Sequence, residues 1–116
     1  GGQPAGPYSS PPPPPPPGGG LPPFAGAVSM ATSSDGYGGT LPSFLPPSIT
    51  IRRGGTVTWT NEGRAPHTVT ASDGTWDSGN LSPGASFERR FATPGTYSYV
   101  CRYHPWMTGT VQVAPS

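Results

Sequence analysis

Along the chain from residue 49 onward, hydrophobic side chains recur at even spacing with polar residues between them. This is the pattern of strands that have one buried face. No segment keeps the repeat of three to four residues that an amphipathic helix requires. The pattern therefore predicts an all-β protein. The residues concerned are Ile49 and Ile51; Val57 and Trp59; Phe87 and Phe91; Tyr97, Tyr99 and Cys101; and Val111 and Val113.

Turn signals rich in Gly, Pro, Asn and Asp separate these runs. They lie at residues 53–55, 61–63, 72–74, 82–84 and 93–95, a spacing typical of a β-sandwich. Earlier strands are expected at about residues 25–32 and just before Pro46. About ninety residues suffice for one core. We therefore predict a single β-sandwich domain over residues 24–116.

The first 23 residues differ in composition from the rest. Gly and Pro supply 17 of these 23 positions, and residues 11–17 are an unbroken proline run. Such a segment cannot bury a core, and seven prolines favour a polyproline II rod of about 20 Å. We interpret residues 1–23 as a linker or stem. The alternatives are a docking site for a proline-recognising partner and a display segment glycosylated at Ser9 and Ser10.

The net charge is small, at +1, from six Arg, no Lys and five acidic residues. It excludes nucleic-acid binding and broad membrane adsorption as the main task. The sequence contains neither a membrane-spanning stretch nor a signal peptide, and it starts at Gly1. We therefore expect a processed or trimmed chain with no membrane span. An upstream lipid or membrane anchor is an open alternative.

Four side chains are suited to binding one metal ion. Cys101, His104 and Met107 follow one another at intervals of three, and the other histidine of the chain is His67. A thiolate and two imidazoles with a weak axial thioether accept both Cu(I) and Cu(II). Zinc more often takes four strong ligands, usually several of them cysteines, and this chain has one Cys. These residues predict one copper ion per chain.

Around these residues the chain resembles the small cupredoxins, most closely the amicyanin and plastocyanin types. The likeness covers residues 56–61, 66–67, 94–99, 101–107 and 109–113, within the last two thirds of the chain. The short interval between His104 and Met107 favours the amicyanin type. The resemblance implies a Greek-key β-sandwich with a type 1, or blue, copper site that carries single electrons.

Two positions depart from the pattern of that family. Its members commonly have Asn after the first His ligand and Pro before the second, and here these positions hold Thr68 and Tyr103. A threonine hydroxyl can also form a hydrogen bond between the two ligand loops, and such bonds tune a metal site. We therefore expect an altered reduction potential and an intact site.

The predicted function is electron transport and not catalysis. Both histidines are assigned to one site, so the chain lacks ligands for a second copper centre that could bind a substrate. A cysteine nucleophile with a histidine base lacks an acidic orienting residue near the motif. The main alternative is copper delivery, storage or sensing, followed by an anchored structural module. A buried free cysteine with two unrelated histidines is the remaining one.

Compartment and partners follow from the same residues. A lone cysteine is an oxidation liability in an oxidising compartment unless a metal holds it, and the ligand role removes that difficulty. We therefore expect an extracytoplasmic protein, in the periplasm or at the outer face of a membrane. Its expected partners are redox proteins that dock near His104, Pro105 and Trp106. Arg64 and Arg102 neighbour the ligands and favour a partner with acidic groups.

Overall fold

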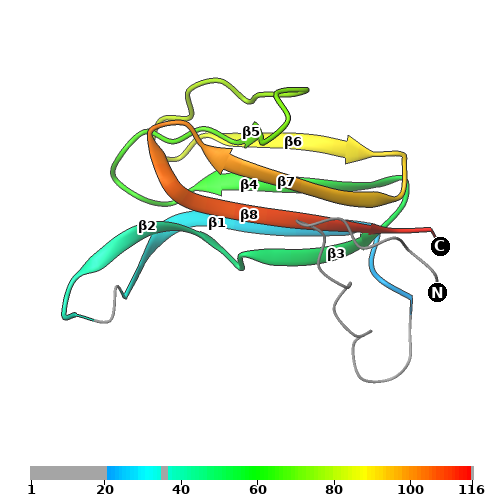
Figure 1. Ribbon diagram of the computed structural model, residues 1–116, viewed down its shortest axis with the longest axis horizontal. Coiled ribbons are helices and arrows are strands. Elements are labelled where there is room, and N and C mark those ends of the chain that lie inside the picture. Colours follow the sequence, from blue (N-terminus) through cyan, green and yellow to red (C-terminus); the bar gives the residue numbers. More distant parts are fainter. Residues whose placement is uncertain (1–20, 35–36, 116) are drawn as a thin grey trace.

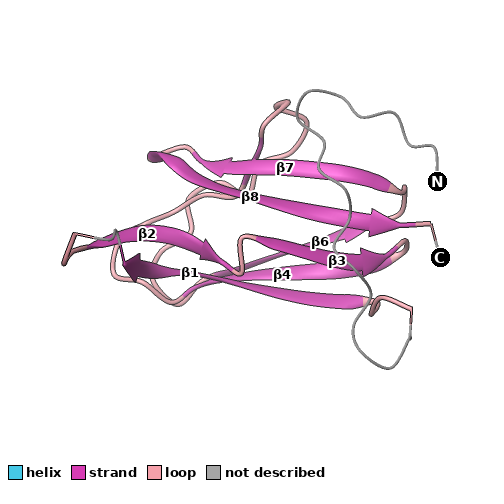
Figure 2. Cartoon of the chain, turned by 60° about the horizontal axis from the view of Figure 1, so that its bottom comes forward, coloured by secondary structure: helices cyan, strands magenta, loops and turns pink. Residues whose placement is uncertain are grey.

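The computed structural model describes residues 21–34 and 37–115. Within these ranges the chain forms eight strands and no helix (Figure 2), so this part contains no helix that could cross a membrane. The all-β prediction is confirmed, while residues 1–20 of the predicted stem lie outside the described ranges. The strands are β1 (Ala25–Ser34), β2 (Thr40–Leu45), β3 (Ser48–Arg52), β4 (Gly55–Asn61), β5 (Thr70–Ala71), β6 (Ser86–Phe91), β7 (Gly95–Cys101) and β8 (His104–Ala114).

The strands form two sheets packed face to face (Figure 1). One sheet has the order β2-β1-β4-β6, and the other has the order β3-β8-β7-β5. β1 runs parallel to β4 and β3 runs parallel to β8, whereas the remaining pairs are antiparallel. Consecutive strands β2, β3 and β4 change sheet at each step, as in a Greek-key sandwich. The predicted architecture is therefore confirmed.

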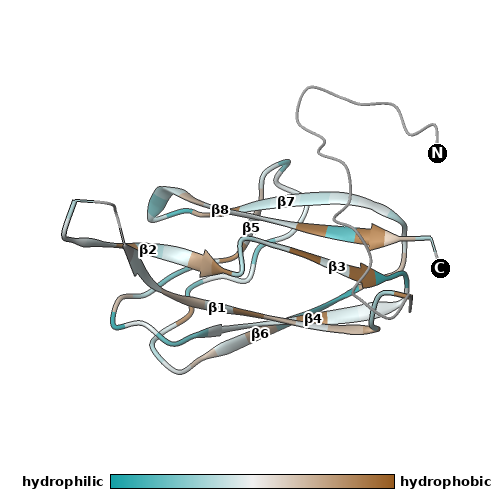
Figure 3. Cartoon of the chain, turned by 90° about the horizontal axis from the view of Figure 1, so that it is seen from below, coloured by the Kyte–Doolittle hydropathy of each residue, from teal (hydrophilic) through white to brown (hydrophobic). Residues whose placement is uncertain are grey.

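The core is built from the alternating positions that the sequence indicated. Figure 3 shows hydrophobic and hydrophilic segments alternating along β8. Trp59 of β4 is fully buried, and its ring centroid lies 5.3 Å from that of Tyr99 and 5.7 Å from that of Phe87. Aromatic contacts of this kind fix the two sheets against each other. β7, which ends at Cys101, is therefore anchored in the core.

The predicted boundary after residue 23 falls inside a segment that already contacts the sandwich. Arg52 of β3 donates from its backbone N–H to the carbonyl of Pro23 at 2.8 Å and from Nε to the carbonyl of Pro22 at 3.2 Å. Its guanidinium also lies over the ring of Phe24, 4.2 Å from the centroid. Pro22 and Pro23 thus contact the domain, and the division of the chain at residue 23 stays a prediction.

The end of the sandwich on the left of Figure 1 gathers the residues that the sequence singled out. β4 and β7 end there and β8 begins there. β8 begins at His104 itself, so His104 and Met107 lie on a strand that starts well before the predicted run of Val111 and Val113. A register shift between Val100 and Cys101 brings Cys101 opposite His104, so only two residues connect the strands.

Candidate metal centre

Three of the four predicted ligands converge at this end. The donor atoms of His67, Cys101 and His104 all lie within 4.8 Å of one another. The Cys101 Sγ atom is 3.7 Å from Nδ1 of His67 and 3.6 Å from Nδ1 of His104. A nitrogen bound at about 2.0 Å and a sulfur bound at about 2.3 Å lie this far apart when the angle between their two bonds at the ion is about 120°. Both sulfur–nitrogen separations therefore fit a single ion bound between Cys101 and each histidine.

Burial differs among the four residues in a way that suits a protected centre with one accessible edge. Cys101 is fully buried, His67 is 2% exposed and Met107 is 1% exposed, whereas His104 is half-buried. Burial lowers the pKa of His67, and the charge of His104 lowers it further. A neutral imidazole keeps a lone pair free for a metal. The axial role of Met107 stays a prediction.

Thr68 links the two segments that carry the candidate ligands. Its backbone N–H points to the Sγ atom of Cys101 at 3.4 Å, and its hydroxyl accepts a hydrogen bond from the backbone N–H of Arg102 at 2.9 Å. The bond expected from a threonine at this position is therefore present. At the surface, the Tyr103 hydroxyl donates to Oδ1 of Asn80 at 3.0 Å.

Asn61 holds the loop that leads to His67, a role that was not predicted from the sequence. Its Nδ2 donates to the carbonyls of Ala65 at 2.8 Å and Leu81 at 2.9 Å, and its Oδ1 accepts from the N–H of Gly63 at 2.9 Å. Leu81 in turn exchanges two backbone hydrogen bonds with His67. Asn61 shares the inward face of β4 with Val57 and Trp59. A polar residue at an inward-facing strand position was the sequence signal that could have indicated its structural role.

The surface beside His104 is apolar and hollowed. Trp106 is 53% exposed, and its ring centroid lies 5.2 Å from that of His104. Trp106 and the exposed Leu41 of β2 line a hollow of about 350 Å³. Arg64 is exposed, but Arg102 is paired with Asp77 at 2.7 Å. One of the two charges expected to attract an acidic partner is thus balanced within the chain.

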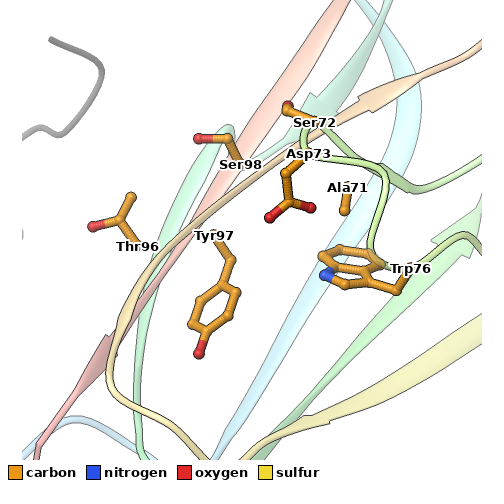
Figure 4. A pocket seen from close by; sticks show the side chains of 7 residues that line it. All are labelled: Ala71, Ser72, Asp73, Trp76, Thr96, Tyr97 and Ser98. Atoms are coloured by element: carbon orange, nitrogen blue, oxygen red, sulfur yellow. The ribbon is translucent and has the colours of Figure 1, made fainter. Parts of the chain in front are cut away.

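A larger hollow, of about 530 Å³, lies apart from the donor cluster and beside β5 and β7 (Figure 4). The rings of Trp76 and Tyr97 and the carboxylate of Asp73 line it. Thr75 donates to that carboxylate from its hydroxyl and backbone N–H and lowers the pKa of Asp73, while Arg89 lies over the Trp76 ring. None of the four candidate metal ligands lines this hollow.

Comparison with known sequences agrees with the donor set. Residues 30–114 match a family model described as copper binding proteins of the plastocyanin/azurin family. Amicyanin-alpha of Methylorubrum extorquens is 36% identical over 75 residues, a match that covers 60% of this chain and 63% of the relative. Plastocyanin of Scenedesmus fuscus is 36% identical over 83 residues, covering 60% of this chain and 85% of the relative. The chain thus spans a little under two thirds of the amicyanin.

Solved structures give the same result for the fold. A purple cupredoxin from Nitrosopumilus maritimus superposes with a TM-score of 0.66 at 31% identity, covering 77% of this chain and 99% of the relative. The Cu(I) form of an amicyanin variant gives a TM-score of 0.64 at 27% identity and covers 78% and 83% of the two chains. A copper-containing nitrite reductase from Thermus scotoductus gives 0.64 at 26% identity, but this chain covers only 23% of it.

Proposed function

The chain belongs to the plastocyanin/azurin family of copper-binding proteins, and we propose that it carries single electrons between redox proteins by means of one type 1 copper centre. The convergence of His67, Cys101 and His104 within 4.8 Å is the observation that carries this proposal. Amicyanin and plastocyanin among the relatives support it. Copper supplies the couple between Cu(I) and Cu(II).

In this proposal each residue has a distinct role. His67 and Cys101, both buried, would hold the copper ion together with His104. Met107 would supply a weak thioether donor. The ligands come from β7, from β8 and from the segment that Asn61 fixes, so they keep their positions when the charge of the centre changes. A rigid site lowers the reorganisation that electron transfer requires.

The half-buried edge of His104 is the proposed route for electrons, and the partner docks on the apolar surface around Trp106 and Pro105. Both of these side chains are exposed. We further infer that this chain is not itself an enzyme, because both of its histidines belong to the one candidate site and leave no ligands for a second copper centre where a substrate could bind. We also propose an extracytoplasmic location, in which a bound metal would protect the single cysteine from oxidation.

Retention of copper through a redox cycle separates electron transport from copper delivery. We expect the loaded protein to be reduced and reoxidised reversibly, with one electron per chain and no transfer of metal to a competing Cu(I) chelator. Spectroelectrochemistry in the presence of the chelator measures both quantities. Loss of copper on reduction would refute the carrier function and favour delivery or storage, because delivery sites exchange their metal readily.

Replacing Met107 by Leu should raise the reduction potential while copper stays bound. Loss of the thioether removes an axial donor that helps to stabilise Cu(II), so Cu(I) is favoured. We expect at least a tenfold shift of the Cu(I):Cu(II) ratio, which corresponds to about 59 mV for one electron. Cyclic voltammetry measures it. Met30→Leu is the matched control, because Met30 is the second methionine and is buried in β1. Equal potentials in both variants would exclude Met107 as a ligand.

A further inference from the structure

Four residues form a closed ring of hydrogen bonds beside the candidate centre. The backbone N–H of Arg102 donates to Oγ1 of Thr68 at 2.9 Å, and the Thr68 hydroxyl lies 2.9 Å from Oγ1 of Thr70. The Thr70 hydroxyl donates to Oδ1 of Asp77 at 3.2 Å. The guanidinium of Arg102 donates to Oδ2 of Asp77 at 2.7 Å and closes the ring. The ring therefore joins both ligand-bearing segments to one carboxylate.

The chemistry of the groups gives the ring a single direction. An ionised carboxylate only accepts hydrogen bonds, so Thr70 must donate its one hydroxyl proton to Asp77. The Thr70 oxygen is then an acceptor, and the proton between the two threonines belongs to Thr68. The Thr68 oxygen is left with a lone pair for the N–H of Arg102. Asp77 thus determines how the Thr68 hydroxyl is oriented, although it lies nine residues further along the chain.

Asp77 is itself held firmly. The backbone N–H of Gly79 donates to Oδ1 at 2.8 Å, and the backbones of Thr70 and Asp77 form an antiparallel bridge. The Gly79 bond, followed by the bonds from Arg102 and Thr70, keeps the pKa of Asp77 below its usual value. The carboxylate is therefore a fixed acceptor, and its two oxygens receive bonds from opposite sides of the ring.

The ring acts on the cysteine through Thr68 and Arg102. Thr68 directs its backbone N–H at the Sγ atom of Cys101, and Arg102 is the residue directly after that cysteine. Hydrogen bonds around the cysteine sulfur are one of the features that tune a copper–thiolate centre. A donor to sulfur stabilises negative charge there and so favours the reduced state. The orientation of Thr68 therefore affects the reduction potential of the copper site.

We propose that Asp77 and Thr70 are positioning residues for the copper centre, acting through Thr68 and Arg102 to hold the Thr68 N–H against the sulfur of Cys101. The inference rests on the proposed function of the site. This positioning role accounts for the exposed ion pair between Arg102 and Asp77. An isolated surface ion pair usually contributes little to stability. The positioning role also explains how the chain keeps its two ligand segments together with Thr68 in place of the usual Asn.

Thr70→Val is the variant that tests the ring without changing any charge. Valine has nearly the shape of threonine and suits a strand, so β5 is expected to form. Without the Thr70 hydroxyl, the Thr68 hydroxyl loses its acceptor and turns, which loosens the bonds to Arg102 and to Cys101. We expect about a threefold shift of the Cu(I):Cu(II) ratio toward Cu(II), a fall in potential of about 28 mV, together with a displaced visible band.

Two controls isolate the ring. Thr70→Ser restores a hydroxyl and should return the potential and the band to the values of the unmodified protein. Thr58→Val removes a threonine hydroxyl that donates to a carboxylate, that of Glu88, on the outer face of the other sheet. This control should leave both values unchanged. A shift of equal size in Thr58→Val would assign the effect to general loss of hydroxyl groups and would refute the proposal.

A measurement on the metal-free protein separates failure of this inference from failure of the proposed function. We expect hydrogen exchange of the Arg102 amide, followed by NMR in the apo-protein, to be about tenfold faster in Thr70→Val than in the unmodified protein or in Thr70→Ser. Unchanged exchange and an unchanged potential would overturn the positioning role. If the unmodified protein gave no intense copper band, the proposed function would fail, while the exchange data would still decide whether the ring fixes Arg102.

Discussion

Cys101→Ser should abolish the intense visible absorption of the copper-loaded protein. The band of a type 1 centre arises from charge transfer between a thiolate and Cu(II), and a serine hydroxyl offers no sulfur to the metal. Serine is close in size to cysteine, and residue 101 is buried at the end of β7, so the sandwich itself is expected to remain. Visible spectra recorded at equal copper content provide the measurement. We expect a loss of at least tenfold in absorption.

The variant also tells whether the histidines act with the cysteine. His67 and His104 remain within reach of one ion, so residual, weakly coloured copper binding is expected. Near-ultraviolet circular dichroism of the apo-variant checks that the packing of the aromatic core is retained. If the folded Cys101→Ser protein kept an unchanged band, the cysteine would not be a ligand, and the assignment of the whole site would be wrong.

Asn61→Ala should cause the largest loss of stability among the changes near the centre. The substitution leaves the carbonyl of Ala65 and the N–H of Gly63 without their partner, and it leaves the carbonyl of Leu81 with the N–H of His67 alone. Each unsatisfied buried group costs about 1–3 kcal/mol, and water reaches part of this loop, so we expect about 2–4 kcal/mol in total. Urea denaturation of the apo-protein measures the loss. Copper should also dissociate faster, because the loop before His67 is freed.

Asn80→Ala is the matched control for that measurement. Asn80 is exposed, and its side chain contacts the hydroxyls of Tyr103 and Ser82 at the surface. A surface substitution of this kind usually changes stability by about 0.5 kcal/mol or less. If the two variants lost similarly small amounts of stability, Asn61 would not be what fixes the loop before His67.

Strand positions could be predicted because burial repeats every two residues in a strand. Val57 and Trp59 in β4, and Tyr99 and Cys101 in β7, are buried as the alternation indicated. β5 could not be predicted, since two residues are too few to display a period. The start of β8 was missed for a related reason, because the tight connection after Cys101 depends on a register shift that leaves no mark in the hydrophobic pattern.

The candidate ligands could be predicted because their chemistry is specific and three of them lie close together in sequence. The residues that hold these ligands in position could not be predicted. Asp77 is one of five acidic residues in the chain, and nothing in its local sequence distinguishes it from Asp73. Its role depends on where the fold places Arg102 and Thr70, which are 25 and seven residues away. Because the fold pairs Arg102 with an acidic residue of the same chain, Arg102 is not one of the free charges that we expected to attract an acidic partner.

Addition of Cu(II) to the purified apo-protein, followed by visible absorption, tests the central claim most directly. We expect an intense band at about 600 nm that saturates at one copper per chain. Because a purple cupredoxin is among the related structures, the intensity and the stoichiometry decide the outcome more than the wavelength does. A colourless or faintly absorbing complex at saturation would contradict the claim, since it would mean that Cys101, His67 and His104 do not bind one ion together.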